Sequence, residues 1–202
     1  VAKLGRFRIN LFRQRGTTGI AIRAVNTSVP TFEELHLPDS VRKIAQLRRG
    51  LVIITGTTGS GKSTTLAALI EEMNAKRTDN VLTIEDPIEY IYRDKKSIIS
   101  QREVGGDTET FASALRHAFR QDPDVILIGE VRDLETMSIA LTAADTGHLV
   151  LTTLHTLNVV ETISRIISFF PPHQHQQIRL LLGGTLKSIV CQRLLVRSDM
   201  PG

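Results

Sequence analysis

The feature that most constrains this chain is the run Gly-Thr-Thr-Gly-Ser-Gly-Lys-Ser at residues 56–63, which fits the pattern G-x-x-x-x-G-K-[ST] at every fixed position. It lies between an apolar strand pattern at residues 51–54 and a helix-forming stretch at residues 64–73. Glycines in such a loop let backbone N–H groups turn inward onto phosphates, and the following helix presents its positive end to them. This context predicts a nucleoside triphosphate site and disfavours an ordinary tight turn.

The loop also contains the polar side chains that such a ligand needs. Lys62 is expected to reach the terminal phosphates, and the Ser63 hydroxyl is expected to ligate Mg²⁺. ATP and Mg²⁺ are therefore the predicted cofactors. The residues predicted to bind the nucleotide are Gly56, Thr57, Thr58, Gly59, Ser60, Gly61, Lys62, Ser63 and Thr64.

Length and composition indicate a globular chain with one α/β domain and part of another. It has 202 residues, of which 41% are hydrophobic, and this is enough for a buried core. The single cysteine, Cys191, lies in a stretch that we predict to be helical and buried, and it excludes a disulfide within the chain. No apolar run approaches the ~18 residues that a membrane span needs, so we expect a cytoplasmic protein. The first residue is Val rather than Met, which leaves room for an upstream segment.

The net charge of +4 raises nucleic acid as a rival partner. Arginine outnumbers lysine by more than two to one, as is typical of chains that bind phosphates or charged interfaces. However, the arginines are dispersed, aromatic residues make up only 4%, and tryptophan is absent. Single-strand binding usually needs aromatic stacking platforms, so no direct nucleic acid partner is expected.

The N-terminal 50 residues differ in pattern from the rest. Residues 6–25 alternate between apolar and polar, as in a β-hairpin whose turn is at residues 15–19. Two strands do not stand alone, so residues 1–29 are predicted to be the end of a smaller N-terminal domain. Residues 30–50 are predicted to be a linker with short helices, including a capping box at 31–34 that is followed by a stop at Pro38.

From residue 51 to residue 202 apolar strand patterns alternate with helical ones, which predicts a parallel sheet covered on both faces. The predicted strands are residues 51–55, 81–85, 125–129 and 148–154. The predicted helices, besides 64–73, are residues 108–120 with Asp107 as cap, 134–145 with Asp133 as cap, 159–169 and 173–189.

Three carboxylates, Glu85, Asp86 and Glu89, lie at the end of the second predicted strand. The carboxyl edge of an open α/β sheet is where ligands bind, and a carboxylate near a phosphate loop can deprotonate an attacking water. An acidic turn that is simply solvated explains the same residues equally well. The sequence pattern alone leaves both interpretations open.

Two further strand ends carry groups suited to the same site. The strand 125–129 is followed by Glu130, as in a Walker B strand, where the carboxylate reaches Mg²⁺ through water or polarises the nucleophile. A helix-capping acid is the alternative, but it would leave the metal held on one side only. His148 and His155 bracket the next strand without the spacing of a zinc site, and His155 is the better candidate for sensing the γ-phosphate.

The four segments 56–63, 83–89, 129–133 and 146–156 together resemble the Walker A, aspartate, Walker B and histidine boxes of the secretion ATPase superfamily. This superfamily of P-loop NTPases drives type II secretion and type IV pili, and the resemblance is greatest to the pilus retraction ATPases of twitching motility. It implies a RecA-like core preceded by a PAS-like α+β domain. It also implies that Glu89 is the catalytic base, that Glu130 lies near Mg²⁺, and that His148 and His155 couple the site to the rest of the subunit.

The resemblance implies roles for several arginines as well. Arg8 and Arg23 match arginines that contact the phosphates when the N-terminal domain closes over the site. Arg116 and Arg120 match further arginines near the site, although a solvated helix face explains them equally well. Arg132, inside the Walker B box, is grouped with the coupling residues.

The resemblance further implies a homohexameric ATPase at the inner membrane's cytoplasmic face, working on a membrane platform protein at the pilus base. Assembly motors of the superfamily commonly carry a tetracysteine zinc motif soon after the segment that matches 192–196, and no cysteine follows here, which favours retraction. The family's C-terminal helical region is expected to lie beyond Gly202. The alternatives are an assembly or secretion ATPase, a DNA-translocating RecA-like ATPase, and a subunit that binds ATP without hydrolysing it.

Overall fold

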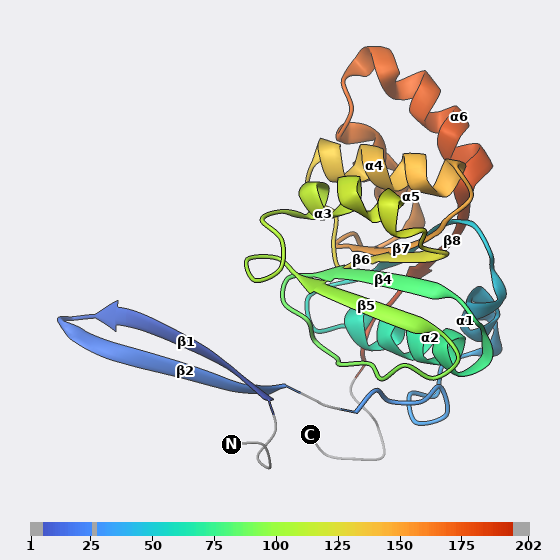
Figure 1. The fold of residues 1–202 in the computed structure, drawn as a ribbon. Helices are drawn as coiled ribbons and strands as arrows, with labels where there is room; N and C mark the ends of the chain where they lie inside the picture. The colour runs from blue at the N-terminus through green and yellow to red at the C-terminus, as the bar shows by residue number, and fades with distance from the viewer. Residues whose placement is uncertain (1–5, 26–27, 196–202) are drawn as a thin grey trace.

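The computed structural model describes residues 6–25 and 28–195. In this part of the chain, a six-stranded sheet has the order β5-β4-β6-β7-β3-β8, and a separate two-stranded sheet pairs β1 with β2 (Figure 1). The paired strands of the larger sheet all run parallel. The strands are β1 (Arg6–Gln14), β2 (Thr17–Val25), β3 (Gly50–Thr55), β4 (Asn80–Glu85), β5 (Ile98–Glu103), β6 (Val125–Ile128), β7 (Leu149–Leu154) and β8 (Leu186–Cys191).

Helices cover both faces of the large sheet, as the buried apolar strands require (Figure 1). Every residue of β3, β6 and β7 is buried, so these strands have no polar face to expose. The helices and 3₁₀ turns are α1 (Asp39–Arg42), η1 (Lys43–Gln46), α2 (Lys62–Lys76), α3 (Phe111–Ala118), η2 (Phe119–Gln121), α4 (Leu134–Asp145), α5 (Val159–Ser168), η3 (Pro172–Gln174) and α6 (His175–Thr185).

The alternation of side chains along β3 divides the interior into two cores. Val52 and Ile54 pack with α1, η1 and α2 on one face, while Leu51 and Ile53 pack with α3, α4, α5 and α6 on the other. The predicted α/β class with a parallel sheet flanked by helices is thus confirmed. All four predicted strands are present within one residue at each end.

The structure confirms one of the two predicted helix caps and corrects the other. Helix α4 spans residues 134–145 as predicted, and the Asp133 carboxylate accepts a hydrogen bond from the Thr136 N–H. Helix α3 begins later than predicted, because Thr110 and not Asp107 is its N-cap. The Asp107 carboxylate instead accepts from the Glu103 N–H at 2.8 Å, which holds a turn before the helix.

The predicted helix at 173–189 is wrong in its last four residues. Helix α6 ends at Thr185, directly after Gly183 and Gly184, and the chain then forms β8. Glycine pairs destabilise helices, while β-branched residues such as Ile189 fit an edge strand beside β3. Cys191 therefore ends a strand and is exposed, contrary to the prediction of a buried helical cysteine.

Strand β5 was not predicted at all. It is an edge strand that pairs only with β4, and its sequence Ile-Ile-Ser-Gln-Arg-Glu carries mostly polar residues. Ile98 stays 64% exposed, so burial imposes little pattern on this strand. An edge strand of this kind gives a weak sequence signal.

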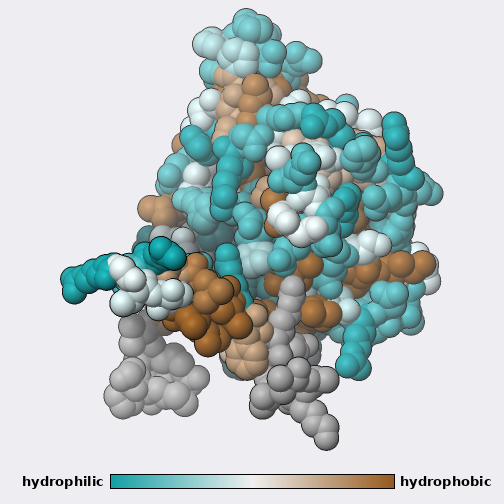
Figure 2. Space-filling view, turned by 60° about the vertical axis from the view of Figure 1, so that its left-hand side comes forward, coloured by the Kyte–Doolittle hydropathy of each residue, from teal (hydrophilic) through white to brown (hydrophobic). Residues whose placement is uncertain are grey.

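The predicted N-terminal hairpin is confirmed, but its turn is shorter than the predicted 15–19: it consists of Arg15 and Gly16, both at positive φ, and β2 begins at Thr17. The pairs Phe7 with Ala24, Ile9 with Ile22 and Leu11 with Ile20 share one face. The larger side chains of this face are 46–66% exposed, and apolar side chains gather on the hairpin in Figure 2.

The segment that follows has the predicted capping box. The Thr31 N–H donates to Glu34 Oε2 at 2.8 Å, and the Glu34 N–H donates back to the Thr31 hydroxyl at 3.2 Å. It closes a turn rather than a helix, and Pro38 then precedes α1. The parts of the predicted domains at residues 1–5, 26–27 and 196–202 lie outside the described residues. Across the described ranges, no helix is long and apolar enough to cross a membrane.

The corrected start of α3 can be tested by stability. Thr110→Ala removes the side chain that accepts from the Ser113 N–H, and we expect it to lower the free energy of unfolding by about 1 kcal/mol. The neighbouring exposed Glu109→Ala is the matched control and should change it by less than about 0.5 kcal/mol. Urea unfolding of both variants measures the difference, and equal losses would show that Thr110 is not the cap.

Candidate nucleotide-binding site

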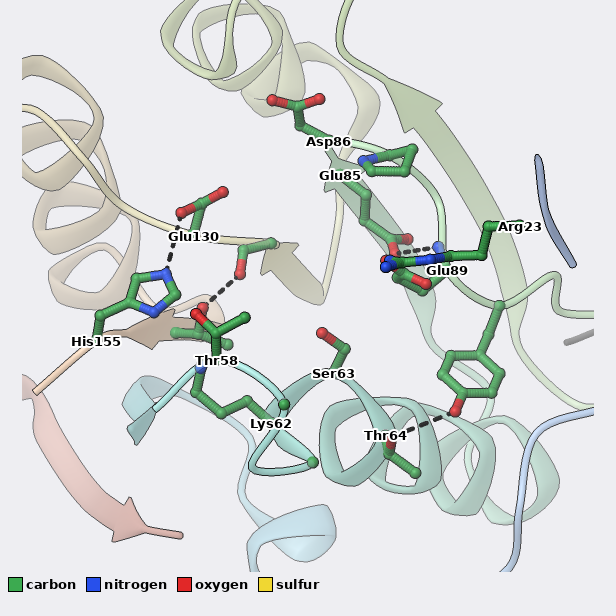
Figure 3. Close-up of a pocket in the computed structure, with 16 residues that line it drawn as sticks. Arg23, Thr58, Lys62, Ser63, Thr64, Glu85, Asp86, Glu89, Glu130 and His155 are labelled. Carbon is green, nitrogen blue, oxygen red and sulfur yellow. Dashed lines mark hydrogen bonds and ion pairs between the residues drawn. The ribbon is translucent and has the colours of Figure 1, made fainter. Parts of the chain in front are cut away.

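The carboxyl ends of β3, β4, β6 and β7 open into one pocket of about 490 Å³. The parallel arrangement brings these strand ends to the same edge of the sheet, although they are far apart in sequence. Ten of the predicted site residues line this pocket: Arg23, Thr58, Gly59, Gly61, Lys62, Ser63, Thr64, Glu89, Glu130 and His155 (Figure 3).

The loop between β3 and α2 has the backbone that its glycines predict. Gly59 and Gly61 have φ values of 79° and 89°, and α2 begins directly afterwards at Lys62. The Lys62 ammonium is buried and donates hydrogen bonds to the carbonyl oxygens of Gly56 and Thr57, both at 2.9 Å. Burial lowers the pKa of Lys62, and the negative charge of Glu130 opposes this shift.

Gly56 is required by space as well as by conformation. Its φ is 145°, and a Cβ atom at this position would lie 2.4 Å from the Gln192 carbonyl oxygen and 2.6 Å from the Ser60 hydroxyl. The chain leaving β8 therefore crosses directly over the start of the loop. Gly56, Thr57 and Ser60 do not line the pocket but shape the loop around it, and the Ser60 N–H donates to the Thr57 carbonyl at 3.2 Å.

The acidic segment after β4 places Glu89 on the opposite side of the pocket from the phosphate loop (Figure 3). Glu85 lies deeper, where its carboxylate accepts from the Thr83 hydroxyl at 2.7 Å and from the Glu89 N–H at 3.4 Å. Burial raises the pKa of Glu85 above its ordinary value despite these hydrogen bonds. Of the two interpretations that the sequence left open, this geometry favours the general base, because a half-buried Glu89 faces the phosphate loop across the pocket.

Glu130 follows β6 and is held between a guanidinium group and an imidazole ring. Its carboxylate pairs with Arg132 on one side and lies 3.3 Å from His155 Nε2 on the other. Arg132 also approaches Asp86 at 3.9 Å. Burial alone would raise the pKa of Glu130, but hydrogen bonding and charge from Arg132 and then His155 outweigh it and lower the pKa.

The hairpin brings one arginine to the pocket. Arg23, on β2, extends toward the Glu89 side of the pocket (Figure 3). Arg8 is directly opposite Arg23 in the hairpin register and shares its face, but does not line the pocket. Two like charges facing each other destabilise a bare hairpin, so this pair favours a nearby anion.

Four of the five predicted coupling residues, all except His155, do not line the pocket. His148 precedes the amino end of β7, at the opposite edge of the sheet from His155, and its Nδ1 lies 3.0 Å from the Ala143 carbonyl. Arg116 pairs with Glu135 on α4, and Arg120 is exposed on η2. Arg132 is the one member of the predicted arginine set that pairs with a pocket carboxylate in the described residues.

The sequence interpretation missed residues that support the site through hydrogen bonds. The Tyr90 hydroxyl lies 3.2 Å from the Thr64 hydroxyl, and Thr153 donates to the Gly129 carbonyl at 2.7 Å. Gln192, after β8, donates to the Thr65 hydroxyl at 2.8 Å. The position of Tyr90 next to Glu89 was an available signal, whereas the contact between Gln192 and Thr65 depends on a strand that was not predicted.

Comparison with known proteins places these motifs in a family. The family described as "Type II/IV secretion system protein" matches residues 6–200. The chain belongs to this family. It is 49% identical over 199 residues to the type IV pilus ATPase PilU of Pseudomonas aeruginosa, which covers 98% of this chain and 52% of that protein. It is 47% identical over 195 residues to the retraction ATPase PilT of the same organism, covering 96% and 57%.

The fold is also shared with a solved member. The crystal structure of the pilus retraction motor PilT superposes with a TM-score of 0.94 at 52% identity, covering 96% of this chain and 57% of that one. This similarity confirms the RecA-like α/β core expected from the motifs. The chain spans only about half the length of these relatives.

The electrostatics of Glu130 give a test that needs no ligand. Arg132→Gln removes the strongest influence lowering the pKa of Glu130, so the pKa should rise. A ¹³C NMR titration of the side-chain carboxyl groups measures it directly. Arg116→Gln, which breaks an exposed pair elsewhere, is the control and should leave the Glu130 titration unchanged. An unshifted Glu130 in the Arg132 variant would show that the pair does not control its ionisation.

Proposed function

We propose that this chain is the nucleotide-binding part of an ATP-hydrolysing motor subunit that powers retraction of a type IV pilus. The observation that carries the proposal is the meeting of Lys62, Glu89 and Glu130 around one pocket, although they follow three different strands. The relatives PilT and PilU are named pilus ATPases, and the solved PilT motor contains ADP. This chain shares the fold of the solved PilT motor and has its own motifs around one pocket, which supports nucleotide binding here.

The residues support hydrolysis by an activated water. Lys62 and the backbone N–H groups of its loop would hold the phosphates, leaving the γ-phosphate toward the centre of the pocket. Glu89 would orient a water and take its proton as it attacks phosphorus. Glu85 supports Glu89 from below, because its carboxylate accepts a hydrogen bond from the Glu89 N–H, and burial raises the pKa of Glu85.

The donor set fits a magnesium ion. The Ser63 hydroxyl and the Glu130 carboxylate face the same pocket, and oxygen donors of this kind suit Mg²⁺ with further waters and phosphate oxygens. When bound, the ion would neutralise charge on the phosphates. The lowered pKa of Glu130 keeps its carboxylate ionised for this role, and His155 beside it would sense the phosphate end of the nucleotide.

The hairpin would supply positive charge from outside the core. Arg23 lines the pocket, and Arg8 lies on the same hairpin face. We infer that residues 1–29 end a PAS-like N-terminal domain that closes over the site, that residues 30–50 link it to the ATPase core at 51–202, and that a C-terminal helical region follows. His148, Arg116 and Arg120 would then couple neighbouring parts of the subunit at a distance from the nucleotide.

The mechanical role extends the same proposal. The subunit would work as a homohexamer at the cytoplasmic face of the inner membrane, on a platform protein of the pilus machine. Retraction is favoured because one of the relatives that align with nearly the whole chain is named a retraction ATPase. Complementation of a retraction-deficient strain with the full-length gene tests this role, and rescue of pilus extension or secretion instead would identify an assembly motor.

The first test of the chemistry separates binding from hydrolysis. Lys62→Ala should abolish nucleotide binding, because the loop loses its buried cation. Glu89→Gln should bind ATP with Mg²⁺ but lower kcat by about 10²- to 10⁴-fold, the range typical of a lost general base. Exposed Glu109→Gln is the control for the charge change. Near wild-type turnover of Glu89→Gln in the full-length protein would remove Glu89 from the role of base.

The second test concerns the hairpin arginines. Arg23→Ala should lower kcat by about 10³-fold, as expected for an arginine that stabilises the transferred phosphate, and leave ATP affinity within about tenfold. Arg23→Lys should rescue poorly, because lysine cannot hold a phosphate with two parallel hydrogen bonds. Arg8→Ala should lower kcat in the same direction.

Arg13→Ala provides a matched control, because Arg13 lies on the same hairpin but on its opposite face. Steady-state kinetics of the full-length protein measures all four variants. If Arg23→Ala and Arg13→Ala lose activity equally, the hairpin arginines are not phosphate contacts but general surface charge.

A further inference from the structure

Gln101, in the middle of the edge strand β5, is joined to the segment that carries Glu89. Its side-chain Oε1 accepts a hydrogen bond from the Tyr92 N–H at 3.0 Å, and its Nε2 donates to the Tyr90 carbonyl at 2.8 Å. The two partners fix the orientation of the amide, because only oxygen can accept from an N–H and only nitrogen can donate to a carbonyl. One side chain thus supplies the hydrogen bonds that a neighbouring strand would otherwise give to the main chain of Tyr90 and Tyr92.

The same amide reaches the acidic cluster. Gln101 Nε2 lies 3.5 Å from Glu85 Oε1, and the other oxygen of Glu85 accepts from the Glu89 N–H. Two residues further along β5, Glu103 lies on the same strand face and its carboxylate accepts from the Ile88 N–H at 3.0 Å. Side chains of β5 therefore hold the main chain immediately before and after Glu89.

The other side of this segment is held by the phosphate loop's helix. Tyr90 contacts Thr64 of α2 through its hydroxyl, as the dashed line in Figure 3 shows. Glu89 thus sits on a short stretch fixed between β5 and α2. A loop without such contacts would sample many positions, and displacement of a reacting group by about 1 Å can cost 10²-fold in rate.

We propose that Gln101 is a positioning residue that holds Glu89 at the distance from the phosphate loop that proton transfer requires. This proposal rests on the proposed function, in which Glu89 is the general base. Gln101 does not itself line the pocket, but it contacts Glu85 and Tyr90, which do. Its effect on hydrolysis must therefore pass through Glu85 and the segment 88–92.

The test uses Gln101→Met in the full-length protein, because methionine keeps the length of the side chain without its amide. We expect kcat to fall about ten- to a hundredfold while the affinity for a fluorescent ATP analogue changes less than about threefold. Both variants should be fully folded at the assay temperature, with the midpoint of thermal unfolding lower in Gln101→Met than in Ser100→Ala, an exposed control on the same strand that should keep full activity.

A double-mutant cycle shows whether Gln101 acts through Glu89. In the Glu89→Gln background, Gln101→Met should cause no further loss, because the base that it positions is already gone. An equal further loss in that background, or unchanged kcat in the single variant, overturns the proposal. Gln101→Glu adds a sign test: its carboxylate would face the Tyr90 carbonyl and Glu85, so its activity relative to wild type should fall as the pH rises.

Hydrogen exchange separates this proposal from the proposed function. The Tyr92 amide should exchange faster in Gln101→Met than in wild type, whether or not the protein hydrolyses ATP. Unchanged exchange across residues 88–92 would show that Gln101 does not hold the segment. Absence of ATP hydrolysis in the wild-type protein, with faster Tyr92 exchange in the variant, would instead contradict the proposed function alone.

Discussion

The buried ammonium of Lys62 is the group on which the site depends. Burying a cation costs free energy unless charge and hydrogen bonds compensate it, and here the compensation comes from two loop carbonyls and the field of Glu130. The loop can supply these carbonyls only because Gly56 passes beneath Gln192 without a side chain. The tight turn, the buried cation and the affinity for an anionic ligand therefore have one origin.

The parallel sheet then turns this loop into a site with several chemical groups. Each parallel strand delivers its following residues to the same edge, so Glu89, Glu130 and His155 come together although each follows a different strand. The acidic side chains at this edge lie in different electrostatic environments. Burial raises the pKa of Glu85, whereas Arg132 and His155 lower that of Glu130, so the pKa values of the two carboxylates are shifted in opposite directions.

The buried strands and the phosphate loop could be predicted from the sequence because strong physical constraints act on them. A strand covered on both faces must be apolar throughout, and a loop with positive φ at Gly59 and Gly61 must use glycine. Strands β5 and β8 escaped prediction because they are edges, where one side is free and the pattern weakens. The end of α6 was missed because two glycines separate apolar residues that fit either a helix or a strand.

The same distinction between buried strands and edge strands applies to the residues of the site. Lys62, Glu89, Glu130 and His155 end or follow buried strands, so their meeting could be predicted from topology. His148 occupies the same motif as His155 but lies at the other end of β7, because six residues of strand separate two opposite edges of the sheet. Gln101 could not be found in this way, since its importance depends on the pairing of β5 with β4, which aligns it with Thr83 and brings its amide to the Glu89 segment. The edge strand β5, which has little sequence signal, thus holds Glu89 in place, although Glu89 itself could be identified from a sequence motif.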